Sequence, residues 1–190
     1  MMIRRATTAD LPRLCRTGMR AFAADPVMRW FYPDDEEYEA GGGAVFRWPM
    51  LRWLQWDETW VTDDVAALAA WIPPGRPEVV VPGPAPTDHP EQRLARFAAI
   101  EQVMAANTPA EPHWYLNFLA THPDWQRQGL GARLIDQVGQ RAAEQGLPLY
   151  LETETVENVA YYLHFGFVVR SEWDVPLDGP HMWGMFRPAP

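Results

Sequence analysis

A run of six residues, Gln126-Arg127-Gln128-Gly129-Leu130-Gly131, carries the clearest chemical signal in this sequence. It lies between a strand-like apolar segment, residues 114–121, and a segment with helical periodicity, residues 132–145. A glycine-containing turn at this position leaves backbone N–H groups unpaired, with the positive end of the helix dipole behind them. Such a turn is an anion site, so we expect it to hold a phosphorylated cofactor.

Three phosphate-binding patterns can be compared with this turn. A dinucleotide-binding fingerprint requires Gly-x-Gly-x-x-Gly, but Leu134 stands where the third glycine is needed. A P-loop requires Gly-Lys-Ser/Thr, which the run does not contain. The third pattern, Gln/Arg-x-x-Gly-x-Gly/Ala, is met by Gln126, Gly129 and Gly131. On this motif alone, an ordinary strand-to-helix turn without a ligand is the alternative.

In this third pattern the chain resembles the GNAT N-acetyltransferases. Over residues 114–188 it is also similar to puromycin N-acetyltransferase-like proteins, whereas the likeness of the N-terminal half is weaker. Two positions depart from that likeness: Ala160 stands where such sequences often have proline, and residues 163–165 replace a more polar stretch. Both changes bear on the acceptor side and leave the turn intact. The residues that carry the likeness beyond the turn are His113, Trp114, Tyr115, Leu116, Pro123, Asp124, Leu151, Glu152, Thr153, Asn158, Val159, Tyr161, Tyr162, His164, Gly166, Phe167, Val175, Pro176, Leu177, Gly179, Pro180, Met182, Trp183 and Met185.

The resemblance implies that the turn and the strand before it bind acetyl-CoA. The pyrophosphate would lie on the backbone N–H groups of residues 127–132, where glycine lets the backbone approach closely, and Arg127 would add a charged contact. The pantetheine arm would follow residues 118–121 as an added strand, and Asn158 would bind its far end. The expected cofactor-binding residues are Phe118, Leu119, Ala120, Thr121, Gln126, Arg127, Gln128, Gly129, Leu130, Gly131, Ala132, Asn158 and Tyr162.

Acetyl transfer from a thioester to an amine requires a neutral amine, stabilisation of the developing oxyanion and a proton for the leaving thiolate. Tyr162 matches the tyrosine with which the family supplies that proton, and a core aromatic role is the alternative. Tyr161 projects about 100° away around the helix and is expected to pack. The N–H group of Leu119 is the expected oxyanion donor. Cys15 falls at an apolar position of the first helix, so we expect direct transfer in a ternary complex without an acyl-cysteine.

Glu152 is the candidate base that takes the proton of the amine, directly or through a water molecule. It shares a strand face with Glu154 by alternation, and it stands near the C-terminal end of the strand expected beside the cofactor. A surface ion pair is the alternative role for Glu152. His113, His164 and His181 are alternative bases because their ordinary pKa values suit the task.

The acceptor pocket is expected among the first helices and the loops after them. The candidate substrate-binding residues are Asp25, Trp30, Phe31 and Trp48, with Met28 beside them. The acidic stretch 34–39 would attract an ammonium group. An aromatic, acidic pocket suits a small amine such as an aminonucleoside, an amino-sugar antibiotic or an aryl-bearing amine. A protein or peptide amine as acceptor, and a non-catalytic CoA-binding regulatory module, are the alternatives.

The elements that must position these residues indicate the fold. A strand at 114–121, a helix ending at 145 and a strand at 149–153 form a crossover, which makes the two strands parallel neighbours. The resemblance implies an α/β (α+β) GNAT acyl-CoA N-acyltransferase fold in a single domain, residues 1–190. In that fold a mixed, mostly antiparallel central sheet contains one splayed parallel strand pair and is flanked by helices.

Other segments must complete the sheet and its helical layers. The patterns predict strands at 2–6, 59–62, 66–72, 167–173 and 182–187. They predict helices at 7–24, 28–32, 91–106 and 156–164. Residues 34–39 are expected to be an acidic stretch, residues 41–43 a glycine interruption, and residues 44–55 a helix broken at Pro49. Residues 73–90, rich in proline and glycine, are expected to be irregular.

The composition limits the class of protein and the partners that can be expected. The 190 residues are 47% hydrophobic and 22% charged, as in an ordinary globular protein with one sizeable core. The formal net charge of -9 disfavours nucleic acid and anionic membranes as partners and favours cationic small molecules. The single cysteine excludes an intrachain disulfide, and no apolar run approaches the length of a membrane span. We therefore expect a cytoplasmic enzyme without a metal, either a monomer or a homodimer.

Overall fold

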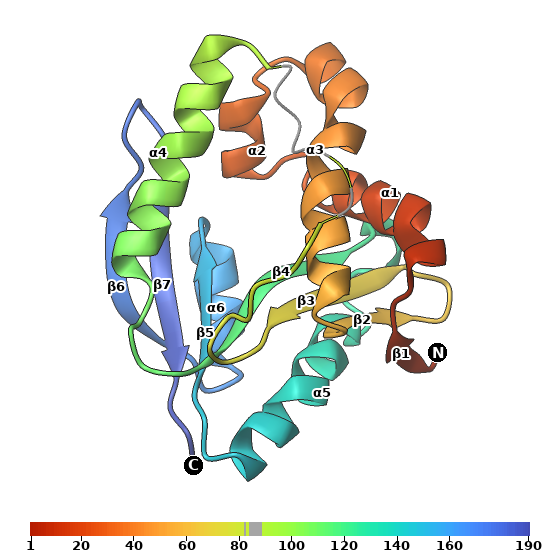
Figure 1. Cartoon of the computed structure of the whole chain (residues 1–190), viewed down its shortest axis with the longest axis vertical. Coiled ribbons are helices and arrows are strands. Elements are labelled where there is room, and N and C mark those ends of the chain that lie inside the picture. Colours follow the sequence, from red (N-terminus) through yellow and green to blue (C-terminus); the bar gives the residue numbers. More distant parts are fainter. Residues whose placement is uncertain (82, 84–88) are drawn as a thin grey trace.

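The computed structural model describes residues 1–81, 83 and 89–190, and it shows a central sheet with helices on both faces (Figure 1). Seven strands follow one another across the sheet in the order β1-β2-β3-β4-β5-β7-β6. The strands are β1 (Ile3–Arg5), β2 (Thr59–Thr62), β3 (Ala67–Ile72), β4 (Trp114–Thr121), β5 (Leu149–Thr153), β6 (Val168–Asp174) and β7 (His181–Arg187). Neighbouring strands are antiparallel except β4 and β5, which are parallel. The predicted mixed, mostly antiparallel sheet is confirmed.

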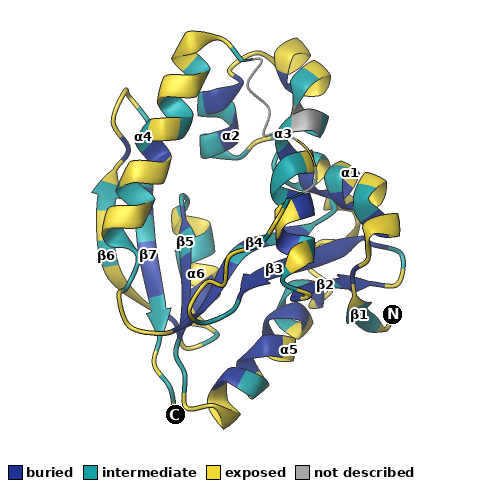
Figure 2. Ribbon diagram, viewed as in Figure 1, coloured by how far each residue is buried: buried dark blue, intermediate teal, exposed yellow. Residues whose placement is uncertain are grey.

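Two hydrophobic layers, one on each face of the sheet, hold the helices. One face carries α5 (Leu130–Glu144) and α6 (Val156–Leu163). The other carries α1 (Leu11–Ala21), α2 (Pro26–Phe31), α3 (Asp35–Gln55) and α4 (Glu91–Asn107). Side chains of β3 alternate between the two layers. Leu68 and Ala70 face the α1 side, whereas Ala67, Ala69 and Trp71 face the α5 side. All residues of β3 are buried (Figure 2), as expected for a strand covered on both faces.

The parallel pair opens soon after it begins, and this opening is the feature that positions the site. Pairing between β4 and β5 starts at Trp114 and ends at Tyr115, which lies opposite Tyr150. Both strands continue beyond that point, β4 to Thr121 and β5 to Thr153. The rest of β4 therefore presents to β5 an edge without strand pairing. The predicted splayed pair is confirmed.

A bulge in β4 lies next to the start of the opening. In the pairing with β3, Phe118 lies opposite Ala70 and Leu116 lies opposite Trp71. Asn117 is therefore an extra residue without a partner in β3. It also lies beyond the last pair with β5. The bulge and the opening together leave main-chain groups of β4 available to a ligand.

Helix α5 is anchored to the sheet along one side, and this anchoring sets the place of its N-terminus. Its buried residues, Leu134, Ile135 and Val138 among them, recur at helical spacing. Near the other end, both terminal nitrogens of Arg141 donate to the carboxylate of Glu58, with Nη1 2.9 Å from Oε1. The same guanidinium stacks over Trp114 at 4.4 Å. The helix is thus fastened at both ends, beginning at Leu130 rather than at the predicted residue 132.

The start of α3 differs from the prediction. The acidic stretch, the glycine interruption and the break at Pro49 do not appear, because residues 35–55 form one continuous helix. Asp34 begins it: its Oδ1 accepts hydrogen bonds from the N–H groups of Glu36 and Glu37, at 2.8 and 3.2 Å. Acidic side chains in the first turn also interact favourably with the helix dipole. The residues of the predicted acidic stretch therefore form the start of a helix.

Packing against neighbouring elements stabilises α3 at its residues of low helix propensity. Gly41 lies so close to Tyr32 that a Cβ built on it would be 3.0 Å from the ring. The glycine thus permits the helix to approach its neighbour rather than interrupting it. Beyond Pro49, Met50 and Trp53 are buried in the core on the α1 side. These tertiary contacts outweigh the poor local helix propensity on which the prediction rested.

The remaining elements agree with the predictions apart from their ends. Helix α1 ends at Ala21 instead of residue 24. Helix α2 starts at Pro26 because Oδ1 of Asp25 accepts a hydrogen bond from the N–H group of Met28 at 2.8 Å. Short 3₁₀ turns precede α1 and follow β4, at Thr8–Asp10 and Pro123–Trp125. The described part of 73–90 contains no helix or strand, and residues 82 and 84–88 of that predicted irregular stretch lie outside the described residues.

We predict that Asp34→Ala lowers the free energy of unfolding by about 1 kcal/mol, because two N–H groups of α3 lose their acceptor. Urea unfolding followed by circular dichroism measures the change. Glu36→Ala is the matched control, since it removes a carboxylate from the same turn without removing a capping hydrogen bond. We expect it to cost only about 0.3 kcal/mol. Equal losses in the two variants would contradict Asp34 as the start of α3.

Candidate active site

The turn predicted to bind phosphates lies between β4 and α5 and is exposed. Arg127 and Gly129 have positive φ angles of 60° and 73°, and Gly129 immediately precedes α5. The N–H group of Arg133 donates a hydrogen bond to Gly129 O at 3.2 Å, and this is the first i to i−4 hydrogen bond of α5. The N–H groups before it therefore lack helical acceptors. A Cβ built on Gly129 meets no atom within 4 Å, so there is open space for phosphate oxygens.

The other residues of the turn serve it in different ways. The side chain of Gln126 donates through Nε2 to Thr121 O at 3.3 Å, which ties the turn to the end of β4. Leu130 is buried in the core on the α5 side and anchors the first helical residue. Gln128 is exposed and Ala132 is half-buried, so the backbone of both lies near the surface. The residues of the predicted phosphate site are thus held together as one turn.

Tyr161 reaches across from α6 to the start of α5. A Cβ built on Gly131 would lie 2.7 Å from the hydroxyl oxygen of Tyr161, so glycine makes room for that hydroxyl. The ring of Tyr161 packs against Tyr162 and Phe165, with centroid distances of 5.2 and 4.9 Å. The predicted packing role therefore describes the ring, and the hydroxyl also lies over the turn.

A cavity of about 250 Å³ adjoins the turn and collects predicted cofactor residues from separate parts of the chain. Leu119, Ala120 and Thr121 line it from β4, Gln126 from the turn, and Asn158 from α6. This is the space beside the unpaired edge of β4. The structure thus brings the predicted path of the pantetheine arm next to the predicted phosphate site.

Phe118 differs from its neighbours on β4. Its ring is buried on the α1 side, 4.6 Å from the ring of Phe22 and 4.8 Å from that of Trp53. The side chain is therefore part of the core. Only the main chain of Phe118 is placed to contact a ligand in the opening.

Tyr162 projects from α6 into the core on the α5 side. It is buried, and its ring centroid lies 5.8 Å from that of Phe167. Burial raises the pKa of the Tyr162 hydroxyl above its ordinary value, and the nearby carboxyl of Glu154 raises it further. The phenol is therefore protonated at neutral pH, which is the form that donates a proton.

Glu152 is a buried carboxyl on β5. Tyr115 of β4 donates a hydrogen bond to Oε2 of Glu152, whereas Oε1 has no hydrogen-bond partner among the described residues. Burial raises the pKa of Glu152 to about 7, against the opposing effects of the hydroxyls of Tyr115 and Tyr150 and the charge of Arg76. A carboxyl with this pKa is poised to accept a proton near neutral pH. A surface ion pair is not its role.

The three candidate histidines have local partners elsewhere. His113 is buried, with Nδ1 2.7 Å from Glu111 O, and burial lowers the pKa of its imidazole. His164 Nδ1 lies 2.7 Å from Ala160 O, within its own helix end. His181 pairs with Asp174 on the neighbouring strand β6. None of the three lines the cavities described for this site.

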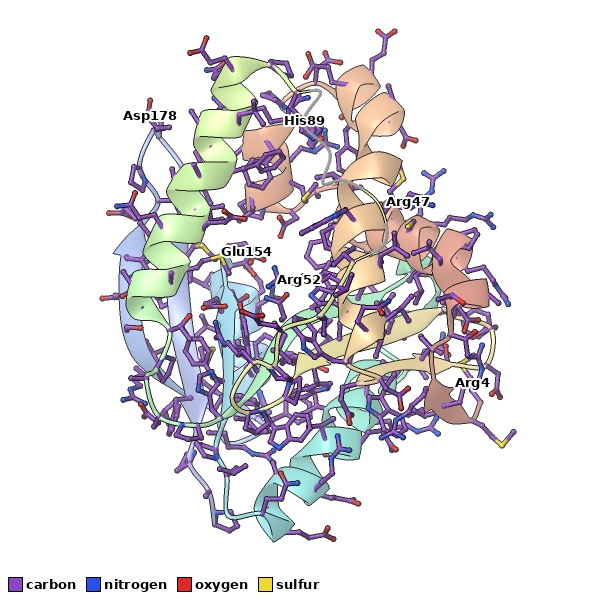
Figure 3. All side chains as sticks on the ribbon, viewed as in Figure 1. Arg4, Arg47, Arg52, His89, Glu154 and Asp178 are labelled. Carbon is purple, nitrogen blue, oxygen red and sulfur yellow. The ribbon has the colours of Figure 1, made fainter. Side chains whose placement is uncertain are left out.

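Asp25 and Glu154 form a carboxyl pair that sequence reasoning did not anticipate. They come from the start of α2 and from the residue after β5, and both line the 250 Å³ cavity; Figure 3 shows Glu154 at the end of β5. Burial raises the pKa of both carboxyls, and each carboxyl influences the pKa of the other. Two carboxyls in contact cannot both ionise cheaply, so the pair shares a proton at neutral pH. Asn158 donates to Oε1 of Glu154 at 3.4 Å.

The acceptor side of the sheet contains two larger cavities between α3 and α4. One, of about 450 Å³, has Tyr115 and Asn117 of β4 in its wall. The other, of about 350 Å³, includes Phe31 and Trp48 from the predicted substrate pocket, together with Met28. Asp25 is not part of either, because it lines the smaller cavity beside β4. The predicted substrate residues are therefore divided between two places.

Trp30 and the acidic stretch lie outside these cavities. The indole Nε1 of Trp30 donates to Leu177 O at 3.0 Å, and Arg96 stacks over its ring at 5.4 Å. The acidic residues 34–39 belong to the beginning of α3, where Asp35 pairs with Arg29 at 2.6 Å. Neither feature lines any of the three cavities described above.

Several residues of the acceptor side escaped sequence reasoning. They come from α3, from the segment after β3, and from β4, and include Arg52, Trp53, Arg76, Tyr115 and Asn117. Tyr115 was visible only as part of an apolar strand, although alternation from Tyr150 and Glu152 on the parallel neighbour could have suggested a shared face. For the arginines no local signal distinguishes a cavity wall from a solvated surface.

Two kinds of feature are absent among the described residues. No helix among them is both long and apolar enough to cross a membrane. No group of three or more histidine, cysteine, aspartate or glutamate side chains there is arranged to hold a metal ion.

Comparison with known proteins was made on sequence and on structure. The acetyltransferase (GNAT) family model matches residues 44–167. An uncharacterized N-acetyltransferase of Schizosaccharomyces pombe is 33% identical over 72 residues, a match that spans 34% of this chain and 29% of that relative. The chain therefore matches under a third of the length of this curated relative.

Two solved structures resemble the whole chain. A histone acetyltransferase HPA2 and related acetyltransferase from Corynebacterium glutamicum has a TM-score of 0.69 and 23% identity, covering 100% of this chain and 96% of its own. Arylalkylamine N-acetyltransferase 2 from Aedes aegypti has a TM-score of 0.68 and 9% identity, covering 100% and 99%. At these identities the likeness concerns the fold. Together with the family match over more than half of the sequence, it shows that this chain belongs to the acetyltransferase (GNAT) family, whose enzymes use acetyl-CoA as acetyl donor.

Proposed function

We propose that this protein transfers the acetyl group of acetyl-CoA directly to the amine of a small molecule, with both substrates bound at once. The observation that carries the proposal is the opening between β4 and β5, which has a phosphate-type turn at one end and a buried carboxyl beside it. Leu119 lines the cavity next to the turn and Asn117 lines the 450 Å³ cavity, so only Phe118 separates the two along β4. Donor and acceptor can therefore reach the same stretch of strand.

Different parts of the chain bind different parts of the donor. The backbone N–H groups from Arg127 to Ala132 receive the pyrophosphate, with help from the helix dipole and from the charge of Arg127. The free edge of β4, from Phe118 to Thr121, pairs with the extended pantetheine arm. Asn158 faces the same space. Acetyl-CoA, when bound, supplies the thioester whose acetyl group is transferred.

Two buried groups handle the protons of the reaction. Glu152 accepts the proton of the acceptor's ammonium group, which leaves a nucleophilic amine. Tyr162 donates a proton to the departing thiolate. The N–H group of Leu119 stabilises the developing oxyanion. Cys15 takes no part, because it packs in α1 against the core and burial raises the pKa of its thiol.

The dimensions of the acceptor side favour a small molecule over a protein. The cavity of about 450 Å³ lies within the range of small-molecule sites, and α3 and α4 border it on two sides. The names of the two similar structures refer to histone and to arylalkylamine acetylation, so relatives of this fold include both classes. The likeness of the C-terminal half to puromycin N-acetyltransferase-like proteins adds aminonucleosides to the amines to test.

We predict that small aryl-bearing amines, aminonucleosides or amino sugars cause release of free CoA from acetyl-CoA, measured with a thiol reagent. The best small amine is expected to have a kcat/KM at least about tenfold above that of any peptide with a free N-terminus or lysine, because the chain beyond the acetylated residue has to extend out of the cavity. Faster turnover of peptides would overturn the small-molecule assignment. Binding of acetyl-CoA without release for any amine would favour a non-catalytic CoA-binding module instead.

We predict that Tyr162→Phe lowers kcat by about 100-fold or more, because the departing thiolate loses its proton donor. Calorimetry should show the affinity for acetyl-CoA changed by less than about threefold, since the ring remains in the core. Tyr161→Phe is the matched control on the same helix, and its kcat should stay near that of the wild type. Equal kcat values for the wild type and Tyr162→Phe would exclude Tyr162 as the proton donor.

We predict that kcat/KM for the amine rises with pH and levels off above about 7, as Glu152 loses its proton. Below that pH Glu152 is protonated and cannot accept the amine proton. Its titration is set by burial and by the groups that face it, namely Tyr115, Tyr150, Thr108 and Arg76. Glu152→Gln should remove this limb of the profile and lower the plateau by about 100-fold.

The control for this profile is Glu154→Gln, which alters the neighbouring carboxyl pair. It should retain a limb with a midpoint near pH 7. If the limb disappears in Glu154→Gln and persists in Glu152→Gln, the base is Glu154 and the assignment of Glu152 is wrong. The profiles are measured at saturating acetyl-CoA so that donor binding does not contribute.

A further inference from the structure

The two cavities between α3 and α4 are neighbouring chambers that differ in chemistry. Trp53 and Glu101 line both of them. The first chamber, of about 450 Å³, has charged side chains in its wall, and the second, of about 350 Å³, is bounded mainly by aromatic and aliphatic side chains. A ligand that spans both would have a polar end and an apolar end.

Trp53 is a fixed partition between the chambers. Its indole Nε1 donates to Oδ1 of Asn117 at 2.7 Å, and its ring packs on Phe118 at 4.8 Å. The side chain is buried. Because both contacts are with β4, the partition keeps its place relative to the opening of the sheet. The chambers are therefore built into the fold.

Two arginines line the first chamber without a carboxylate partner among the described residues. Arg52 comes from α3, and Figure 3 shows it beside the space between α3 and the end of β5; Arg76 follows β3. Arg52 stacks over Trp56 at 5.5 Å and Arg76 over Tyr115 at 4.9 Å. Neither guanidinium makes an ion pair or a hydrogen bond with any residue that the structure describes. Their planes are thus held by aromatic rings while their N–H groups are left for an anion.

The proposed base, Glu152, is linked to the sheet side of the same chamber through Tyr115. Tyr115 lines the chamber and donates to Glu152, whose other carboxylate oxygen is buried without a partner in the described structure. Arg76 lies over the ring of that tyrosine. One tyrosine therefore separates the site that takes an ammonium proton from a site that attracts an anion. A ligand whose ammonium group and anionic group are a few bonds apart could therefore reach Glu152 and Arg76 at once.

The second chamber suits an aromatic group. Phe31 and Phe97 lie edge to face at 4.4 Å in its wall, and Trp48 and Phe46 extend the wall along α3. Aromatic walls of this kind bind rings through burial of apolar area and through edge-to-face contacts. The chamber wall contains two side chains that could carry a charge: Glu101, which stands at the junction with the first chamber, and His89, which packs edge to face with Phe97 at 5.3 Å.

We propose that the acceptor is an aryl-bearing aliphatic amine that also carries a carboxylate, with the carboxylate on Arg52 and Arg76, the amine at Glu152 and the ring in the chamber of Phe31 and Phe97. The inference rests on the proposed function, because it assigns the acceptor of the same site. It adds an anion subsite that the acidic, cation-attracting pocket predicted from the sequence does not contain. Bidentate pairing of guanidinium with carboxylate supplies the discrimination.

Equilibrium binding to the complex with CoA tests the subsites separately from turnover. Calorimetry compares phenylalanine with phenethylamine, which lacks the carboxylate, and with alanine, which lacks the ring. We expect phenylalanine to bind about tenfold or more tightly than either. Arg52→Gln and Arg76→Gln should each remove most of the advantage over phenethylamine without weakening the binding of phenethylamine. Arg47→Gln, which changes an exposed arginine of α3 that lines neither chamber, is the matched control and should bind all three as the wild type does.

The outcomes separate this inference from the proposed function. If phenethylamine binds as tightly as phenylalanine, or if the arginine variants weaken both equally, the anion subsite is wrong even when thiol release shows acetylation of amines. If alanine binds as tightly as phenylalanine, the aromatic chamber is wrong. If arginine-dependent binding of phenylalanine is found without thiol release, the subsites stand and the acetyltransferase activity proposed above fails.

Discussion

Beyond Tyr115, the main-chain polar groups on the edge of β4 that faces β5 need hydrogen-bond partners, and β5 does not supply them. An unpaired strand edge inside a sheet covered by helices on both faces is costly unless a ligand or water completes it. The pairing of β4 with β5 ends at Tyr150, while β4 itself continues to Thr121. Much of the surrounding structure can be understood as holding this opening in place: α5 and α6 cover one face, and α1 to α4 the other.

The two faces of the opening differ because different helices cover them. On the α5 side, burial of Leu134 and Ile135 and the pairing of Arg141 with Glu58 fix the helix whose N-terminus forms the phosphate turn. On the α3 side, no helix fills the opening, and the space between α3 and α4 remains as cavities. Under the proposed function, backbone groups hold most of the donor, whereas side chains define the acceptor site. This difference explains why the donor is common to the family and the acceptor has to be determined for each chain.

The sequence predicts the elements of the proposed donor side, the turn before α5 and the helix after β5, because their signals are local. A turn motif between a strand and a helix places Gly129, and periodicity places Tyr162 on the helix that follows β5. The acceptor side depends on contacts between residues far apart in the chain, such as Tyr115 with Glu152 and Asp25 with Glu154. No local pattern encodes such pairs, because each arises only when strands and loops meet in three dimensions.

Helix α3 shows the same limit in secondary structure. Its glycines and Pro49 have poor helix propensity, so the local prediction breaks the segment into pieces. The helix is continuous because Asp34 caps it and because residues such as Trp53 are buried against the sheet. This misreading hid the acceptor chambers, since an unbroken α3 forms one wall of both.

Hydrogen–deuterium exchange with and without acetyl-CoA measures most directly whether the opening is the donor site. Saturating acetyl-CoA should slow amide exchange in residues 118–121 of β4 and in residues 127–132 of the turn, because the ligand accepts hydrogen bonds from both segments. Exchange in the hairpin of β2 and β3, which is already paired, should stay nearly constant. Unchanged exchange in both segments, under conditions where calorimetry shows acetyl-CoA bound, would contradict the opening of β4 from β5 as the place where the donor binds.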